Sequence, residues 1–167
     1  MIWYSNAPAT SAERQPLPPA VISVAPGLHR LGTGRHTIFG IPIFDASLWI
    51  VGTQYSSSEP HAVDLEPSVP VPPSKLVGEL IEEMGDLKAA DDAQREAWRA
   101  LMLKALPSLG RGDQLVILVM PNGRTTMYYN GEERKSLDDP NFGAALFRVW
   151  LDPATSYQHI RNGMLHR

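Results

Sequence analysis

Two Asn-Gly dipeptides constrain the fold of this chain more than any other sequence feature. They occupy positions 122–123 and 130–131, and an almost wholly apolar run, 114–120, precedes the first of them. Asn-Gly favours tight type I′ hairpin turns, and such an apolar run is typical of a strand covered on both faces. We therefore predict a three-stranded antiparallel meander, with strands at 114–120 and 124–129 and a short, charged edge strand at 132–135.

The rest of the chain separates into groups of strands and groups of helices. Alternating apolar residues with glycine or proline punctuation predict strands at 28–39, 41–50 and 62–69. One-sided apolar stripes predict four helices, at 74–85, 92–107, 139–150 and 152–164. This order lacks the strand–helix alternation of parallel sheets. We predict an α+β fold, in which helices pack on one face of an antiparallel β-sheet.

Composition limits the possible functions. The 167 residues fit one domain, and the absence of cysteine excludes disulfides, a thiol nucleophile and thiolate zinc sites. A net charge of -3 gives no electrostatic footprint for nucleic acid or an anionic membrane. The longest apolar run, 115–120, is too short for a transmembrane segment. We expect no cofactor and no metal. With no signal peptide after Met1, a cytoplasmic location is expected as written, or a periplasmic one if a leader was trimmed.

Proline is concentrated at the N-terminus. Five of the 15 prolines lie in the first 26 residues. Such a segment lacks a helical period and cannot donate a full ladder of backbone hydrogen bonds. We predict a Pro-rich N-terminal arm at 1–26, whose first 20 residues form a tail or follow an edge of the sheet, and a single domain at 27–167. Ile2, Trp3 and Tyr4 could pack against that domain.

The segment Gly32-Thr33-Gly34-Arg35 superficially resembles a phosphate-binding loop. It lacks a correctly spaced third glycine and does not lead into a helix, so we reject a dinucleotide site. Two interpretations remain open. The glycines can form a bulge in a strand, with Arg35 on the surface, or they can admit a close backbone while Arg35 points its charged fork at a ligand.

Other motifs have simple structural explanations. Arg111-Gly112-Asp113 fits a tight turn better than an adhesion motif, and the five histidines show no metal-ligand spacing. Glu82 and Glu83 are expected on the solvent side of their helix. Trp49 and Trp150 are most simply core residues. These residues add no candidate chemistry to that of Arg35.

Several motifs, in order, resemble the chalcone isomerase and chalcone isomerase-like family. The first are Gly32 to Arg35 and Phe44-Asp45-Ala46-Ser47-Leu48-Trp49. The C-terminal half resembles the bacterial chalcone isomerase-like pattern in Gly112-Asp113, Pro121-Asn122-Gly123, Asn130-Gly131 and the stretch from Phe142 to Pro153. The resemblance covers residues 27–167. It implies an open-faced β-sandwich with a ligand cleft between the sheet and the helices.

The resemblance also implies two activities. Plant members are isomerases, intramolecular lyases that close chalcones to flavanones, whereas relatives without that activity bind fatty acids. Arg35 would serve either activity, since a guanidinium can stabilise an enolate oxygen or hold a carboxylate at two points. In the fatty-acid binders a tyrosine assists this arginine.

Three departures from the family pattern bear on the function. Trp49 stands where the family has a tyrosine, Val149 lies near a plant hydroxyl position, and Asp45 lies near the catalytic threonine and could neutralise Arg35. We therefore favour binding of a small hydrophobic ligand, such as a carboxylated, fatty-acid-like one, by Arg35, Trp49, Asp45 and Val149. The alternatives are a chalcone isomerase-type lyase, with Arg35 catalytic, and a non-catalytic interaction protein, which we expect if Asp45 pairs tightly with Arg35.

Overall fold

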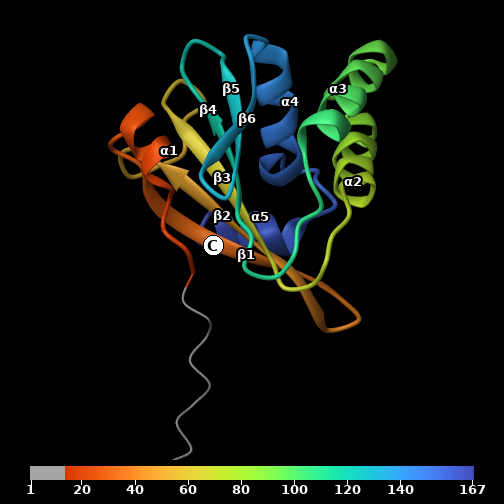
Figure 1. Ribbon diagram of the computed structural model, residues 1–167, viewed down its shortest axis with the longest axis horizontal. Helices are drawn as coiled ribbons and strands as arrows, with labels where there is room; N and C mark the ends of the chain where they lie inside the picture. The colour runs from red at the N-terminus through yellow and green to blue at the C-terminus, as the bar shows by residue number, and fades with distance from the viewer. Residues whose placement is uncertain (1–13) are drawn as a thin grey trace, which may run out of the picture.

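The computed structural model describes residues 14–167, and the expected packing of Ile2, Trp3 and Tyr4 lies outside this range. A six-stranded antiparallel sheet forms the centre of the fold (Figure 1). Its strands, which pair in chain order, are β1 (His29–Ile38), β2 (Ile41–Ile50), β3 (His61–Pro67), β4 (Leu115–Val119), β5 (Thr125–Tyr129) and β6 (Glu132–Leu137). The predicted α+β class and the antiparallel sheet are confirmed.

The two Asn-Gly dipeptides both form hairpin turns, but of different types. Asn130 and Gly131 have φ angles of 48° and 84°, as a type I′ turn requires. At the other turn only Gly123 has a positive φ, of 87°, and the loop contains three residues, 121–123. The meander is therefore confirmed, while the type I′ prediction holds only at 130–131.

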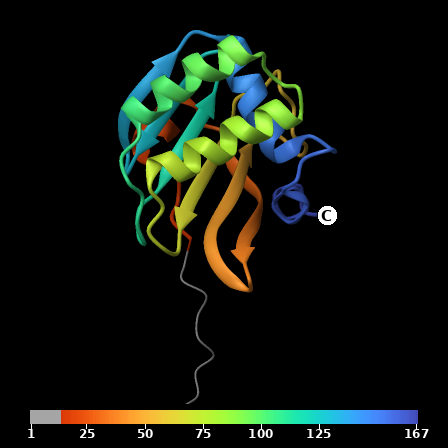
Figure 2. The same ribbon diagram turned by 90° about the vertical axis from the view of Figure 1, so that its right-hand side faces the viewer.

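Four helices cover one face of the sheet (Figures 1 and 2). They are α2 (Pro73–Asp86), α3 (Asp92–Ala105), α4 (Pro140–Leu151) and α5 (Gln158–Met164). The stripe predicted on α4 is buried, with Phe142, Leu146 and Val149 at 0% exposure and Trp150 at 2%. A continuous apolar core thus lies between this face and the helices.

The opposite face carries a short helix, α1 (Pro19–Val24). Leu17, Val21 and Ala25 are buried there, in a cluster with Trp49, Ala62, Val116, Leu118 and Tyr128 of the sheet. The expectation that the Pro-rich arm contains no helix is wrong for 19–24. Proline is tolerated in the first helical turn, where its missing N–H would have no partner.

Helix α5 lies directly against β1, and this contact explains the glycines at 32 and 34. A Cβ on Gly34 would lie 2.5 Å from the carbonyl oxygen of Ile160, and one on Gly32 would lie 2.8 Å from that of Met164. The register of β1 on β2 also shifts between Arg30 and Gly32, as expected of a bulge. Gly32 and Gly34 therefore allow the close approach of the α5 backbone rather than that of a ligand.

Two predictions near the C-terminus are wrong for one shared reason. The last helix begins at Gln158 rather than near Asp152, and Glu83 is buried, with 5% exposure. The Glu83 carboxylate accepts hydrogen bonds from the Ser156 backbone N–H at 2.7 Å, the Ser156 hydroxyl at 2.6 Å and the Thr155 hydroxyl at 3.3 Å. The chain therefore turns after Asp152 instead of continuing as a helix, and the loop before α5 takes Glu83 out of solvent.

Candidate functional site

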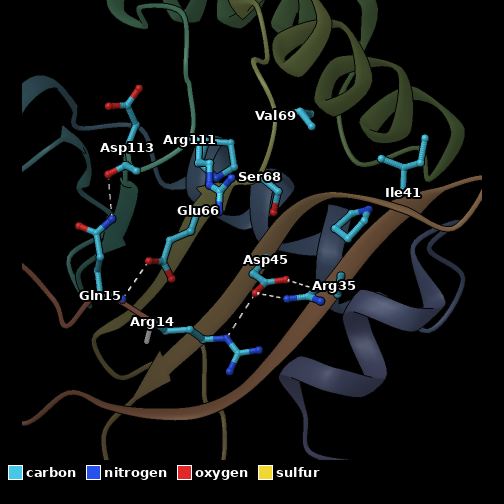
Figure 3. A pocket seen from close by; sticks show the side chains of 13 residues that line it. Arg14, Gln15, Arg35, Ile41, Asp45, Glu66, Ser68, Val69, Arg111 and Asp113 are labelled. Carbon is cyan, nitrogen blue, oxygen red and sulfur yellow. Dashed lines mark hydrogen bonds and ion pairs between the residues drawn. The ribbon is translucent and has the colours of Figure 1, made fainter. Parts of the chain in front are cut away.

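Arg35 and Asp45 face each other across β1 and β2. Arg35 donates from Nε to Asp45 Oδ1 at 2.8 Å and from Nη2 to Asp45 Oδ2 at 3.2 Å. Figure 3 shows Arg14 approaching the same carboxylate, with its Nε 3.5 Å from Oδ2. The hydrogen bonds and the charge of Asp45 raise the pKa of Arg35 above its ordinary value. Arg35 is thus a permanent cation whose charge is shared with a carboxylate.

Two cavities border Arg35, whose side chain is 52% exposed. The larger, of about 500 Å³, lies at the face that carries α1 and mixes charged residues, such as Arg14, Glu66 and Arg111, with apolar ones, such as Ile41 (Figure 3). The smaller, of about 270 Å³, lies between β1 and the start of α5. Arg35 thus stands between a cavity of mixed polarity and a narrower one beside a helix.

The smaller cavity contains a tyrosine that sequence reasoning missed. Tyr157 lines it together with Arg35, His36 and Ile160, and its ring meets that of His36 edge-on at 5.6 Å. Burial, aided by the charges of three nearby glutamates, raises the pKa of Tyr157 above its ordinary value. Its hydroxyl therefore stays protonated and can donate. Nothing in the local sequence connects it to Arg35, because the two lie more than a hundred residues apart.

Trp49 is not close to Arg35. It lies opposite Arg30, four positions beyond Asp45 along β2, or about 13 Å at ~3.3 Å per residue. Its indole N–H donates to Asp64 Oδ2 at 2.8 Å, and the Arg30 guanidinium lies 4.6 Å from the centre of its ring. Trp49 lines neither of the two cavities beside Arg35, and the core prediction for Trp49 is confirmed by its 9% exposure.

Val149 is also separate from Arg35. It is fully buried on α4, in the core between the helices and the sheet, and lines neither of the cavities beside Arg35. Of the four candidate ligand-binding residues, only Arg35 and Asp45 come together.

A third cavity lies away from Arg35. It has a volume of about 440 Å³ and is lined by Leu31, Tyr55, Arg161 and Leu165 among others. The Arg161 Nε donates to the Leu151 carbonyl at 3.0 Å, which fixes the base of its guanidinium. This cavity also combines apolar side chains with a cation, Arg161, so it is an alternative place for a carboxylated ligand to bind.

Asp64 is a buried acid that sequence reasoning also missed. Its exposure is 0%, and burial raises its pKa to about 7 despite the hydrogen bond from Trp49 and the charge of Arg30 at 3.9 Å. Among residues 14–167, its Oδ1 atom has no hydrogen-bond partner. The acidic residue between Val63 and Leu65, in the strand predicted at 62–69, was the signal that could have revealed it.

The described residues hold no group suited to a metal and no membrane-spanning helix. Within 14–167, histidines and acidic residues never gather in threes with a geometry that could hold an ion. No helix in the same range combines the length and the apolar character needed to cross a bilayer.

Comparisons with known proteins agree with this architecture. No relative was found among curated proteins. The crystal structure of an Arabidopsis thaliana fatty-acid binding protein matches with a TM-score of 0.65 and 13% sequence identity, over 83% of this chain and 87% of that one. A family model described as chalcone isomerase-like matches residues 35–166. The chain therefore belongs to the chalcone isomerase-like family.

Proposed function

We propose that this protein binds a small hydrophobic ligand that carries a carboxylate, and that Arg35 contacts the carboxylate. Membership of the family supports this role, and the matched Arabidopsis protein is described as a fatty-acid binding protein. The observation that carries the proposal is the position of Arg35, a half-exposed cation that borders two cavities.

Arg35 retains donors for a ligand although Asp45 is bound to it. A guanidinium has five N–H groups, and Asp45 accepts from Nε and Nη2 only. Arg14 lies beside the same carboxylate, so two cations share one anion. A ligand carboxylate on the outer side of Arg35 would balance the remaining positive charge, while Ile41 and Val69 offer apolar surface to its chain in the larger cavity.

Tyr157 is the second residue that we propose for the site. The family pattern pairs its arginine with a tyrosine, and Trp49 cannot take that part because its N–H is donated to Asp64. Tyr157 lines the smaller cavity, which Arg35 also borders, and its hydroxyl remains protonated across the physiological range. It would donate to an oxygen of a ligand that enters this cavity.

An interaction protein without a ligand is the second candidate. The bidentate pair between Arg35 and Asp45 favours it, because a satisfied cation attracts a further anion less strongly. The core between the sheet and the helices is also filled by the protein's own side chains, among them Val149. This candidate predicts that no carboxylate binds with an affinity that depends on Arg35.

An intramolecular lyase has less support from the geometry. Stabilising an enolate requires a cation aimed at the developing charge, and here Asp45 lies directly against that cation. Trp49 has no free donor for a substrate, and Val149 is buried in the core. The departures noted in the sequence thus remain departures in three dimensions.

Binding of fatty acids of graded chain length tests the proposal by titration calorimetry. Arg35→Met keeps the bulk of the stem but removes the donors and the charge, so affinity should fall about ten- to a hundred-fold. Asp45→Asn removes the competing carboxylate and should tighten binding. Tyr157→Phe should weaken binding by a smaller factor. Folding of the Arg35 variant should be nearly unchanged, because an exposed ion pair contributes little.

Arg124→Met is the matched control. Arg124 is 48% exposed and lies 3.4 Å from Asp138, yet it lines none of the cavities described above. Equal binding by the wild type, Arg35→Met and Asp45→Asn would reject Arg35 as the contact. If Arg161→Met alone weakened binding, the ligand would occupy the third cavity. Native mass spectrometry of protein purified from its own host would identify a retained ligand directly.

A further inference from the structure

The turn between β1 and β2 exposes a large apolar side chain in an unfavourable place. Phe39 is fully exposed, at 101%, and Ile41 is 58% exposed. The turn residues Phe39 and Gly40 have φ angles of 51° and 76°. Figure 2 shows the hairpin extending past the end of the sheet, so its tip stands clear of the domain.

The same turn occurs elsewhere in this chain with a residue that suits it. Asn130 and Gly131 adopt φ angles of 48° and 84°, close to those of Phe39 and Gly40. Asparagine tolerates the left-handed region, whereas a bulky aromatic residue there is an outlier. Folding of the hairpin therefore does not require Phe39. Both its backbone conformation and its exposure to water are unfavourable, which points to a role outside the folded domain.

The tip is also continuous with the proposed ligand site. The segment from Ile38 to Ile43 contains no charged or hydrogen-bonding side chain. Ile41 and Pro42, within it, line the larger cavity beside Arg35. An apolar surface that received the tip would thus lie next to the opening of that cavity.

We propose that the tip at Phe39 and Ile41 inserts into the interface of a lipid bilayer, which brings the larger cavity to the membrane surface. The delivery of a hydrophobic ligand through this contact rests on the function proposed above, but the docking itself does not. Apolar side chains at such an interface are buried among headgroups and acyl chains without needing a complementary shape.

The size and shape of the tip favour lipid over a protein partner. A stable protein interface buries about 800 Å² on each side, far more than two side chains on a narrow, convex turn can supply. The tip carries no charge to orient a partner. Because the chain has a net charge of -3, attraction to anionic lipid is not the driving force, and neutral vesicles should bind it.

Flotation with phosphatidylcholine vesicles tests the docking without any ligand. The wild type should float with the vesicles, and Phe39→Asn should reduce the partition coefficient about ten- to a hundred-fold. This variant should fold at least as stably as the wild type, since asparagine suits the turn as it does at Asn130. Loss of binding could then not be attributed to unfolding. Leu103→Ser is the matched control, because Leu103 is 42% exposed on α3, far along the chain from the tip, and its replacement should leave flotation unchanged.

Each other outcome has a defined meaning. Absence of wild-type flotation, or equal flotation of Phe39→Asn, would overturn the docking. A concentration-dependent dimer in sedimentation velocity that Phe39→Asn abolishes would assign the tip to a second copy and would also overturn it. Binding of a water-soluble short-chain carboxylate, measured without vesicles, tests the proposed function separately. If that binding failed while flotation persisted, docking would stand and the ligand would be rejected.

Discussion

The two faces of the sheet differ in the polarity of the residues that they carry. Along β2, alternate residues such as Leu48 and Ile50 face α2–α5 and join an apolar core. The residues between them, Asp45, Ser47 and Trp49, face the side of α1, where β3 adds Asp64 and Glu66. Both faces are covered, but the face toward α1 also carries the acidic residues of β2 and β3.

The difference follows from what covers each face. Helices satisfy their own backbone groups, so an apolar surface is sufficient beneath them. The segment before α1 is irregular, and its backbone needs partners from the sheet. Arg30 Nη2 donates to the Gln15 carbonyl at 2.9 Å, the Gln15 N–H donates to Glu66 at 2.9 Å, and the Gln114 side chain donates to the Pro16 carbonyl at 3.1 Å. Polar side chains on this face therefore hold the irregular segment before α1 in place.

Replacing Phe142 by alanine should have the largest effect and tests the apolar face. Phe142 is fully buried between α4 and the sheet, and Phe→Ala changes at such sites cost about 3–5 kcal/mol. On the other face, Val21→Ala removes two methyl groups and should cost about 1–2 kcal/mol. Urea denaturation of both variants measures the difference. A loss below about 1 kcal/mol for Phe142→Ala would contradict the assignment of the main core.

On the polar face, Asp64 should contribute a pH dependence of its own. Because the pKa of Asp64 rises from 3.8 to about 7 on folding, the folded protein binds a proton that the unfolded chain releases. The contribution of Asp64 to the free energy of unfolding should fall as pH rises from about 4 to 7, by at most about 4 kcal/mol.

Asp64→Asn removes this titration while keeping an acceptor for the Trp49 indole. We expect the variant to resemble the wild type near pH 4, where Asp64 is protonated in the folded protein and partly so in the unfolded chain, and to exceed it in stability near pH 8. Denaturation curves at a series of pH values measure both proteins. Parallel pH profiles for the two would show that Asp64 does not titrate in this range.

The contact between β1 and α5 should give a smaller effect than the loss of Phe142 from the main core. Gly34→Ala places a Cβ against the backbone of Ile160 and should cost about 1–3 kcal/mol, as overpacking does. Gly78→Ala is the control, since a Cβ there meets nothing within 4 Å and alanine favours the helical conformation of α2. Thermal melts should shift down for the first variant and up for the second. A melting temperature unchanged by Gly34→Ala would mean that α5 can move away from β1.

Local sequence patterns were sufficient for most of the fold. Two Asn-Gly turns, the apolar run at 114–120 and the helical stripe of Phe142, Leu146 and Val149 identified strands and helices that the structure contains. These patterns depend on neighbours within a few residues, which a sequence displays directly. The short helix α1 escaped prediction because six residues are too few to show a helical period.

The candidate site depended on contacts that no local pattern records. The sequence by itself determined that Arg35 lies beside two glycines in a strand, while tertiary structure decided what each of them meets. The register shift between His36 and Thr37 in the β1–β2 pairing sets which residue lies opposite Arg35, and a slip of one position would have turned its side chain to the other face. Asp45 thereby became its partner and Trp49 did not. The approach of α5 brought Tyr157 to the cavity that Arg35 borders, and a loop more than seventy residues along the chain buried Glu83. Strands and turns follow from local stereochemistry, whereas partners across a sheet or between layers follow from how complete elements pack.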